Sequence, residues 1–292
     1  MSLFNMEKHR LLQSSQGWTS YYLLHPKNKV ALAEIHFHFE DGLASSPFRS
    51  PFGSLEGLEG IPSEALFGFL EFVEQRIRLN GGKKVVIKNP PQAYDIDTQS
   101  VLTTFLVNQG YSISNAEMGA VISIDQPFEN SLDSWERRKL KQGHEADLEL
   151  REVSIDKVEE VYKFILARRI GKGYSISMTF DELKRTLQIF SDRFLPFGVY
   201  KQNTLIAASI CIRVRSNVLY NFYSDHDKAM DHLSPIVFLM EGIHEYARLH
   251  KIALLDLGTS AYEGKPNFGL LDFKLRLGAK PTMKLTFEKL FN

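Results

Sequence analysis

The sequence holds a single cysteine, Cys211, in 292 residues. One thiol excludes an intrachain disulfide framework and any metal site built from several cysteines, and it suits a reducing compartment. The chain also lacks an excess of either charge, because 35 Lys and Arg residues balance 35 Asp and Glu residues. No overall field therefore attracts nucleic acid or acidic lipid, although a local patch can still do so.

Long hydrophobic runs are missing as well. The longest apolar stretches, such as 205–212, have the length of a strand and fall short of the roughly 20 residues of a membrane span. The first ten residues lack the apolar core of a signal peptide. With 43% hydrophobic and 24% charged residues, the composition is that of a globular protein. We therefore expect a cytoplasmic protein of two domains, at roughly 150 residues each.

The second half carries the clearer pattern of secondary structure. Tight connections at 202–203 and 216–217 predict a three-stranded meander, and a strongly amphipathic helix follows it at 234–250. The full expectation is strands at 148–153, 197–201, 204–214, 218–224, 252–257 and 282–290, and helices at 156–169, 180–190, 234–250 and 268–277.

The first half shows a shorter version of the same order. Apolar and polar residues alternate over 30–39, which predicts a strand with one buried face and one exposed face that carries His36 and His38. The other expected elements are strands at 18–24 and 83–88, a loop at 41–60, helices at 62–79 and 100–108, and a hairpin or bent strand pair at 111–124.

The two halves align as repeats of one block. The glycines that stop corresponding helices, Gly110 and Gly278, are 168 positions apart. This spacing predicts duplication of a domain. We expect a truncated domain at 1–130, a charged linker helix at 131–146 and a more complete domain at 147–292.

Short motifs accompany this order of elements: Leu205-Ile-Ala-Ala208, Tyr220-Asn-Phe-Tyr223, Ser234-Pro235, Leu255-Asp-Leu-Gly-Thr-Ser260, Phe273-Lys274 before Gly278-Ala279, and Ser50-Pro-Phe-Gly-Ser54 in the first half. Together they resemble the GNAT acyltransferase fold, and in particular the tandem-GNAT group that includes the Fem-type peptidoglycan aminoacyltransferases. The resemblance implies an α/β (α+β) protein of two tandem GNAT-like domains, with mixed sheets flanked by helices.

The same resemblance implies an N-acyltransferase that moves an acyl group to an amine. Acyl-CoA is the expected donor, and a small-molecule or peptidoglycan-precursor-like amine is the expected acceptor. Two departures keep alternatives open. No long heptad segment matches the helical arm of the Fem ligases, and the segment 225–233 has none of the glycines of the acyl-CoA loop R/Q-x-x-G-x-G/A. The alternatives are an aminoacyl-tRNA donor and a ligand-binding protein without catalysis.

Candidate site residues gather where the strands at 218–224 and 252–257 end, since open sheets bind ligands at such strand ends. Acyl transfer needs a base, an acid and a group that stabilises an oxyanion. Asp225 is the candidate base, Tyr223 the acid and Lys274 the electrostatic partner, a role that the resemblance also implies. The alternatives are a core position for Tyr223 and a surface position for Lys274. The candidate binding residues are Asp256, Gly258, Thr259, Ser260, Ser234 and Asn267.

Other patterns favour structural roles. His36 and His38 lack an evident third ligand, so no metal site is predicted. The segment 168–173 matches R-x-x-G-x-G letter for letter, but it follows a helix, and we interpret it as a glycine C-cap and not as a phosphate loop. The basic run at 137–141 is interpreted as a solvated helix face, with contact to a phosphate or to tRNA as the alternative.

Overall fold

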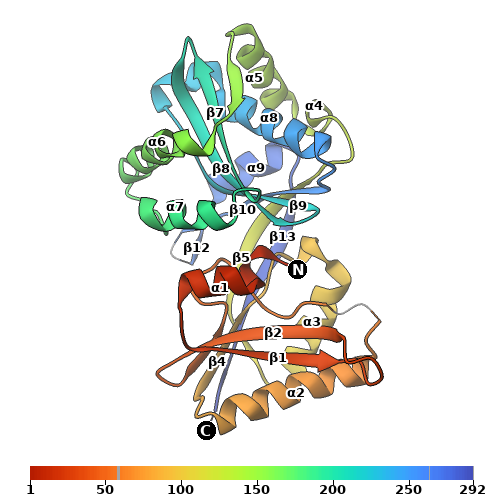
Figure 1. Ribbon diagram of the computed structural model, residues 1–292. Helices are drawn as coiled ribbons and strands as arrows, with labels where there is room; N and C mark the ends of the chain where they lie inside the picture. Colours follow the sequence, from red (N-terminus) through yellow and green to blue (C-terminus); the bar gives the residue numbers. More distant parts are fainter. Residues whose placement is uncertain (58–59, 263, 292) are drawn as a thin grey trace. The chain divides into compact units, whose positions relative to one another are not determined.

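A computed structural model describes residues 1–57, 60–262 and 264–291 (Figure 1). Residues 58 and 59 of the expected loop at 41–60 lie outside the described residues. The chain forms two compact units, one made of Met1–Met118 with Thr282–Asn292 and the other of Gly119–Pro281. These units divide the chain differently from the ranges 1–130, 131–146 and 147–292, because the last strand joins the first unit.

The first unit contains a six-stranded sheet with two long helices. Its strands run in the order β1-β2-β3-β4-β13-β5. The elements are η1 (Leu3–Asn5), α1 (Glu7–Gln13), β1 (Trp18–Leu24), β2 (Ala31–Glu40), β3 (Leu43–Ser46), α2 (Ser63–Leu79), β4 (Lys84–Lys88), η2 (Gln92–Tyr94), α3 (Ile96–Asn108), the first part of β5 (Ser112–Ser123) and most of β13 (Lys280–Leu290).

One core joins these elements. The apolar stripe of α2 packs with the apolar face of β2 and with β4, α3 and β13. Its largest fully buried side chains include Phe37, Ile77, Leu106 and Phe287. Because Phe287 comes from the end of the chain, the first unit needs its last strand to complete its core.

Three expectations for the first half are wrong in detail. The expected loop at 41–60 contains β3, a short Ser-rich strand that pairs with both β2 and β4. The region 111–124 forms one long strand, β5, and no hairpin. Helix α3 begins at Ile96 and not near residue 100, because the side chain of Asp95 accepts a hydrogen bond from the Thr98 amide at 3.0 Å and caps the helix.

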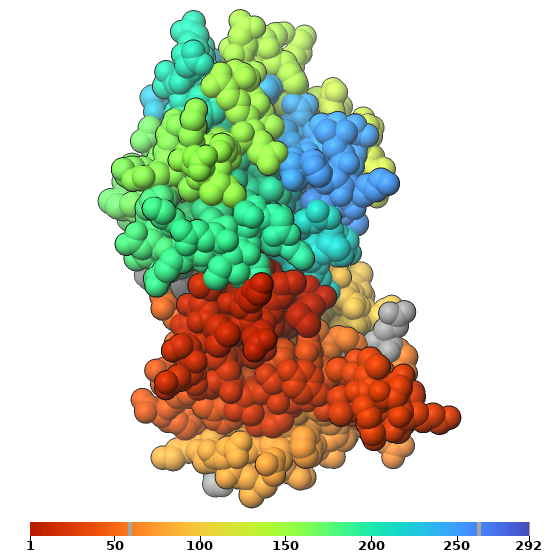
Figure 2. Space-filling view, in the orientation of Figure 1, coloured from red at the N-terminus to blue at the C-terminus, as the bar shows by residue number. Residues whose placement is uncertain are grey.

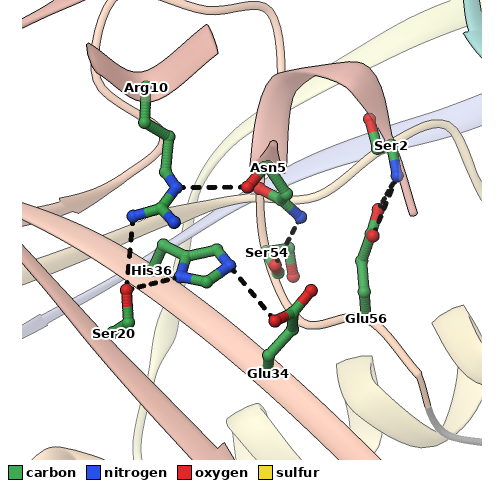
Figure 3. Close-up of polar contacts among 8 residues, drawn as sticks. All are labelled: Ser2, Asn5, Arg10, Ser20, Glu34, His36, Ser54 and Glu56. Atoms are coloured by element: carbon green, nitrogen blue, oxygen red, sulfur yellow. Dashed lines mark hydrogen bonds and ion pairs between the residues drawn. The ribbon is translucent and has the colours of Figure 1, made fainter. Parts of the chain in front are cut away.

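The polar face of β2 is buried, contrary to our expectation. His36 is 2% exposed and His38 is 5% exposed. The N-terminal segment, residues 2–13, covers this region and is held by polar contacts (Figure 3). Arg10 donates to the Asn5 carbonyl at 3.1 Å and to the Ser20 hydroxyl at 3.2 Å, and that hydroxyl lies 2.8 Å from His36 Nδ1. In the space-filling view, dark red atoms of the N-terminal part of the chain are visible at the surface (Figure 2), whereas residues 2–5 are buried.

Two histidines of this region make the stability of the protein depend on pH. Burial lowers the pKa of His9 to about 4 and that of His36 to about 3 in the folded state. Below about pH 6.5 these two histidines therefore bind protons in the unfolded chain but not in the folded chain. As a result, the free energy of unfolding decreases as the pH falls. We expect a loss of up to about 1.4 kcal/mol per pH unit for each histidine. Burial and the nearby Glu56 raise the pKa of Glu34, which offsets part of this loss.

Urea titrations between pH 5 and pH 7.5 measure this dependence. We expect His36→Asn to flatten the pH profile, while the matched change at the exposed His232 leaves it as it is. A profile in His36→Asn as steep as that of the wild type would contradict the assignment.

The second unit contains a sheet in the order β5-β10-β9-β8-β7-β6. Its elements are the end of β5, α4 (Phe128–Ser131), α5 (Ser134–Glu145), β6 (Glu149–Glu152), η3 (Ile155–Lys157), α6 (Val158–Ile170), α7 (Phe180–Ile189), β7 (Phe194–Lys201), β8 (Thr204–Arg215), β9 (Val218–His226), η4 (Lys228–Leu233), α8 (Pro235–Leu249), β10 (Leu254–Thr259), β11 (Ala261–Tyr262), β12 (Lys265–Pro266) and α9 (Phe268–Arg276).

Helices cover both faces of this sheet (Figure 1). Helix α8 packs its buried stripe on one face, in a core that also includes residues of α5 and α9. Helix α6 contacts β7, β8 and β9 as well, but its buried residues Val161 and Ile165 stand outside that core, so it packs on the other face. The expected linker helix is α5, and its Leu140 is buried in the α8 core.

Both halves of the chain follow one order of elements. Three antiparallel strands are followed by a helix, by a strand parallel to the third strand, by a second helix and by a long strand. The long strand of each half pairs with the parallel strand of the other half, since β13 pairs with β4 and β5 pairs with β10. The duplication itself stays a prediction.

Candidate active site

A cavity lies in the second unit where β9 and β10 part. The two strands pair in parallel from Val218 and Leu254 to Tyr220 and Asp256. Beyond this point β9 bulges at Phe222, because Ile210 of β8 faces Tyr223 whereas Cys211 faces Asn221. The cavity has a volume of about 460 Å³. Its described wall consists of Arg169, Lys172, Tyr174, Tyr220, Asn221, Phe222, Ser224, Asp225, Ile236, Met240, Leu257, Gly258, Thr259, Ala261, Asn267, Leu270, Phe273, Lys274 and Leu277.

Lys274 of α9 is the buried cation of this cavity. Asn267 caps the helix by accepting from the Leu270 amide at 3.0 Å, and Leu277 and Phe273 anchor the helix in the α8 core. Lys274 is 6% exposed, and its Nζ donates to the carbonyl oxygens of Gly258 and Thr259, each at 2.9 Å. The alternative of a surface lysine is therefore wrong.

The environment of Lys274 weakens its hold on the proton. Burial lowers its pKa to about 8, and the nearby carboxylate of Asp256 acts in the opposite direction. The ammonium form still dominates near neutral pH. The carbonyl oxygens of Gly258 and Thr259 hold the ammonium group in position. Leu270, one helical turn before Lys274, is 38% exposed and contributes to the cavity wall.

Asp256 shapes the strand end that holds Lys274. This carboxylate is 1% exposed and accepts from the Gly258 amide at 2.7 Å. Gly258 has φ +75°, a conformation that favours glycine. The resulting turn directs two successive carbonyls toward Lys274, so Asp256 acts on the site through the backbone and is not part of the described wall.

Asp225 lines the cavity but is already engaged. Its Oδ1 lies 2.6 Å from Lys172 Nζ and accepts from the His226 amide at 2.8 Å. Acting as a base would require the carboxylate to exchange one of these partners for the amine of a substrate.

Tyr223 faces a different environment. It is 4% exposed, and its hydroxyl contacts the Ser177 hydroxyl and accepts from the Ser177 amide at 3.1 Å. Burial raises its pKa. Tyr223 is not in the described wall of the cavity, and this position agrees with the core alternative.

The remaining candidates divide in the same way. Gly258, Thr259 and Asn267 belong to the wall. Ser260, whose side chain is 2% exposed, and Ser234 lie outside its described part. Ser234 begins α8 with φ 55° and makes no side-chain capping bond.

The segment before α8 forms no glycine cradle. Residues 228–233 fold as η4, and the Asp227 side chain accepts a hydrogen bond from the Ala229 amide at 3.1 Å. The first helical residue of α8 is Pro235, which has no amide hydrogen to offer an anion. The segment 168–173 also gives no cradle: Gly173 closes α6 with φ +76°, and the amides of residues 171–174 donate to carbonyls of that helix.

Sequence reasoning missed the residues that reach the cavity from the α6–α7 side. Arg169 and Lys172 belong to the segment 168–173 that we interpreted as a helix cap only, and Tyr174 directly follows it. The backbone of this segment does form a helix cap, as interpreted. The side chains of these three residues, however, line the cavity. Lys172 contacts Asp225 and Arg169 contacts Tyr223, and each partner is more than 50 residues away in sequence. No local sequence pattern could therefore predict these contacts.

Other chemistry finds little support among the described residues. No group of three or more His, Cys, Asp or Glu side chains in this part of the chain is arranged to hold a metal. Burial raises the pKa of Cys211 to about 12, which disfavours the nucleophilic thiolate. No described helix combines the length and the apolar character that crossing a bilayer requires.

Comparison with known proteins identifies the fold. The crystal structure of FemX matches with a TM-score of 0.75 at 11% identity, over 99% of this chain and 92% of that chain. This protein has a FemX-like, GNAT-like fold. A tandem GNAT protein from the clavulanic acid biosynthesis pathway matches with a TM-score of 0.55 at 10% identity, over 94% of this chain and 83% of that one. A C-terminal domain assigned to a lysylphosphatidylglycerol synthetase from Agrobacterium fabrum matches with a TM-score of 0.60 at 12% identity, over 98% and 89%.

The likeness concerns the fold alone. No protein-family model and no curated protein matches the sequence. The predicted fold class is confirmed: the structure has a mixed sheet flanked by helices in a GNAT-like arrangement.

Proposed function

We propose that this protein transfers an acyl group to an amine in the cavity of its second unit. The observation that carries the proposal is Lys274, a buried ammonium fixed by two backbone carbonyls in the wall of a cavity where two parallel strands part. A preorganised positive charge in a low-dielectric site stabilises negative charge that develops in a transition state.

The reaction has a simple balance. The amine nitrogen attacks the carbonyl carbon of a thioester, and the carbonyl oxygen becomes an oxyanion that Lys274 stabilises. The carbon–sulfur bond then breaks, the thiolate leaves and takes up a proton, and the amine nitrogen loses one. Asp225 is the candidate acceptor of that proton, because it lies in the cavity wall. Tyr223 can serve as the proton donor only if its hydroxyl gives up its hydrogen bonds with Ser177 and contacts the leaving thiolate.

Acyl-CoA is the donor that we propose, and the amine of a peptidoglycan-precursor-type molecule is the acceptor. The fold shared with the tandem GNAT protein of the clavulanic acid pathway, which was solved without AcCoA, supports the donor, and the fold shared with FemX supports the acceptor. A cytoplasmic location is part of the proposal, and the buried free thiol of Cys211 supports a reducing compartment. Aminoacyl-tRNA is the alternative donor.

A second function has one observation in its favour. The segment 225–233 lacks glycine, and its fold as η4 leaves no amide cradle for a pyrophosphate. A duplicated GNAT-like protein without that cradle is suited to binding a ligand without transferring an acyl group.

Calorimetric titration with acetyl-CoA separates these functions. We expect saturable binding, and we expect the folded protein to gain about 2.7 kcal/mol of stability at a ligand concentration of 100 times the Kd. Release of free thiol on addition of an amine then reports transfer. Binding without thiol release for any amine supports the ligand-binding function, and absence of acetyl-CoA binding contradicts an acyl-CoA donor.

A further inference from the structure

Three basic side chains project from the end of α6 and the turn that follows it, and two of them are neutralised. Arg168 pairs with Asp227 at 2.9 Å, and Lys172 pairs with Asp225 at 2.6 Å. Arg169 makes no ion pair with a described residue, and its Nε is buried without a hydrogen-bond partner among the residues that the structure describes. A buried guanidinium donor without a partner is costly, and a ligand that supplies the partner removes this cost.

Arg169 is held in place by the protein around it. Its guanidinium carbon lies 5.4 Å from the centre of the Tyr223 ring, and Tyr223 is in turn fixed by Ser177. The Arg169 carbonyl accepts from the amides of Lys172 at 3.0 Å and Tyr174 at 2.9 Å, which closes the helix end. The side chain is therefore oriented before any ligand arrives, and little ordering entropy remains to be lost on binding.

The cavity that Arg169 lines carries an excess of positive charge. Its described wall contains the cations Arg169, Lys172 and Lys274, and the carboxylate of that wall, Asp225, is taken by Lys172. Lys274 uses two of its donors on backbone carbonyls. The Nε of Arg169, by contrast, has no hydrogen-bond partner among the described residues, and a guanidinium matches the two oxygens of a carboxylate or a phosphate.

Arg169 and Lys274 enter the cavity from opposite faces of the sheet. Lys274 belongs to α9, which shares the core of α8, whereas Arg169 belongs to α6 on the other face. In the proposed reaction the donor carbonyl lies at Lys274, so the side chains of the α6–α7 face meet the second substrate.

We propose that Arg169 binds an anionic group, a carboxylate or a phosphate, on the acyl acceptor. The assignment rests on the proposed transfer reaction, and it makes Arg169 a residue that determines acceptor specificity. The acceptor is then an amine that also carries a negative charge.

Calorimetry with inorganic phosphate and with succinate tests the assignment on the full chain. We expect the wild type to bind at least one of the two probes, and the stronger one identifies the chemistry of the anion. We expect Arg169→Gln to bind it at least tenfold more weakly, and Arg169→Lys to lie between the two, because it keeps the charge and loses the planar fork. The matched control Arg168→Gln, which removes a paired arginine, is expected to bind within twofold of the wild type.

Acetyl-CoA forms the second arm of the experiment. We expect Arg169→Gln to bind acetyl-CoA as the wild type does, which places the anion on the acceptor. Equal loss of acetyl-CoA binding would assign Arg169 to the donor and overturn the proposal. Unchanged binding of both probes by Arg169→Gln, or no binding of either by the wild type, would also overturn it. Failure of the proposed function shows separately, as a wild type that does not bind acetyl-CoA.

Discussion

Replacement of Lys274 by methionine is expected to lower the rate of acyl transfer by about a hundredfold or more, with little change in folding. Removing one preorganised electrostatic group from a catalytic site has an effect of this size. Methionine has a similar length and no charge, so the contacts of α9 with the core are kept. Lys274 is 6% exposed and burial lowers its pKa, so we expect the folded protein to lose little stability when this charge is removed.

The effect is expected in kcat more than in KM, because the charge acts on an oxyanion that exists only during the reaction. The wild-type rate should also fall as the pH rises through the Lys274 pKa of about 8, where the ammonium loses its proton. This decline should disappear in Lys274→Met. Full activity in this variant would remove Lys274 from the site.

A matched control is available on α7. Lys184 is an exposed helical lysine of the same unit, and Lys184→Met is expected to leave the rate and its pH profile as in the wild type. Similar losses in the two variants would show that the effect of Lys274→Met does not come from the cavity.

Replacement of Gly278 by alanine is expected to lower the free energy of unfolding by about 2–5 kcal/mol. Gly278 follows α9 with φ +85°, and a left-handed conformation costs an alanine roughly 1–2 kcal/mol. A methyl group there would also overlap the carbonyl oxygen and the side chain of Ser131. Overpacking of this kind adds typically 1–3 kcal/mol. Urea denaturation measures the sum.

Gly173 separates the two contributions. It also ends a helix of the second unit with a positive φ, of +76°, but a Cβ at this position meets no atom within 4 Å. Gly173→Ala should therefore cost only the conformational part, about 1–2 kcal/mol. Equal losses in the two variants would show that contact with Ser131 contributes nothing.

Most secondary structure of the second unit follows from local signals. The capping box of Thr179 and Glu182 begins α7, Pro235 opens α8, and Asn267 caps α9. These signals act within one turn of the chain, which is why sequence reasoning placed these helices within a residue or two. The first unit was harder to predict. Strand β3 has only four residues, and it exists because β2 and β4 supply hydrogen bonds on both sides.

The site was predictable in part. The resemblance and the needs of acyl transfer singled out Lys274, and the strand ends singled out Gly258 and Thr259. The burial of His36 was not predictable, because the segment that covers it is more than 20 residues distant in sequence. The same holds for Arg169, whose position in the cavity depends on β9, and for Tyr223, whose hydroxyl is taken by Ser177.

The sequence by itself determined the order of helices and strands, because hydrophobic period, caps and turns are local properties. The resemblance of its short motifs added the GNAT-like class of fold and the candidate lysine. The tertiary structure decided which strands are neighbours and which polar groups remain without partners. Both β5 and β13 are long strands that follow a helix, and nothing in their own residues indicates which strand each will pair with. Only the folded chain shows that β13 pairs with β4 and that the buried Nε of Arg169 has no hydrogen-bond partner among the described residues.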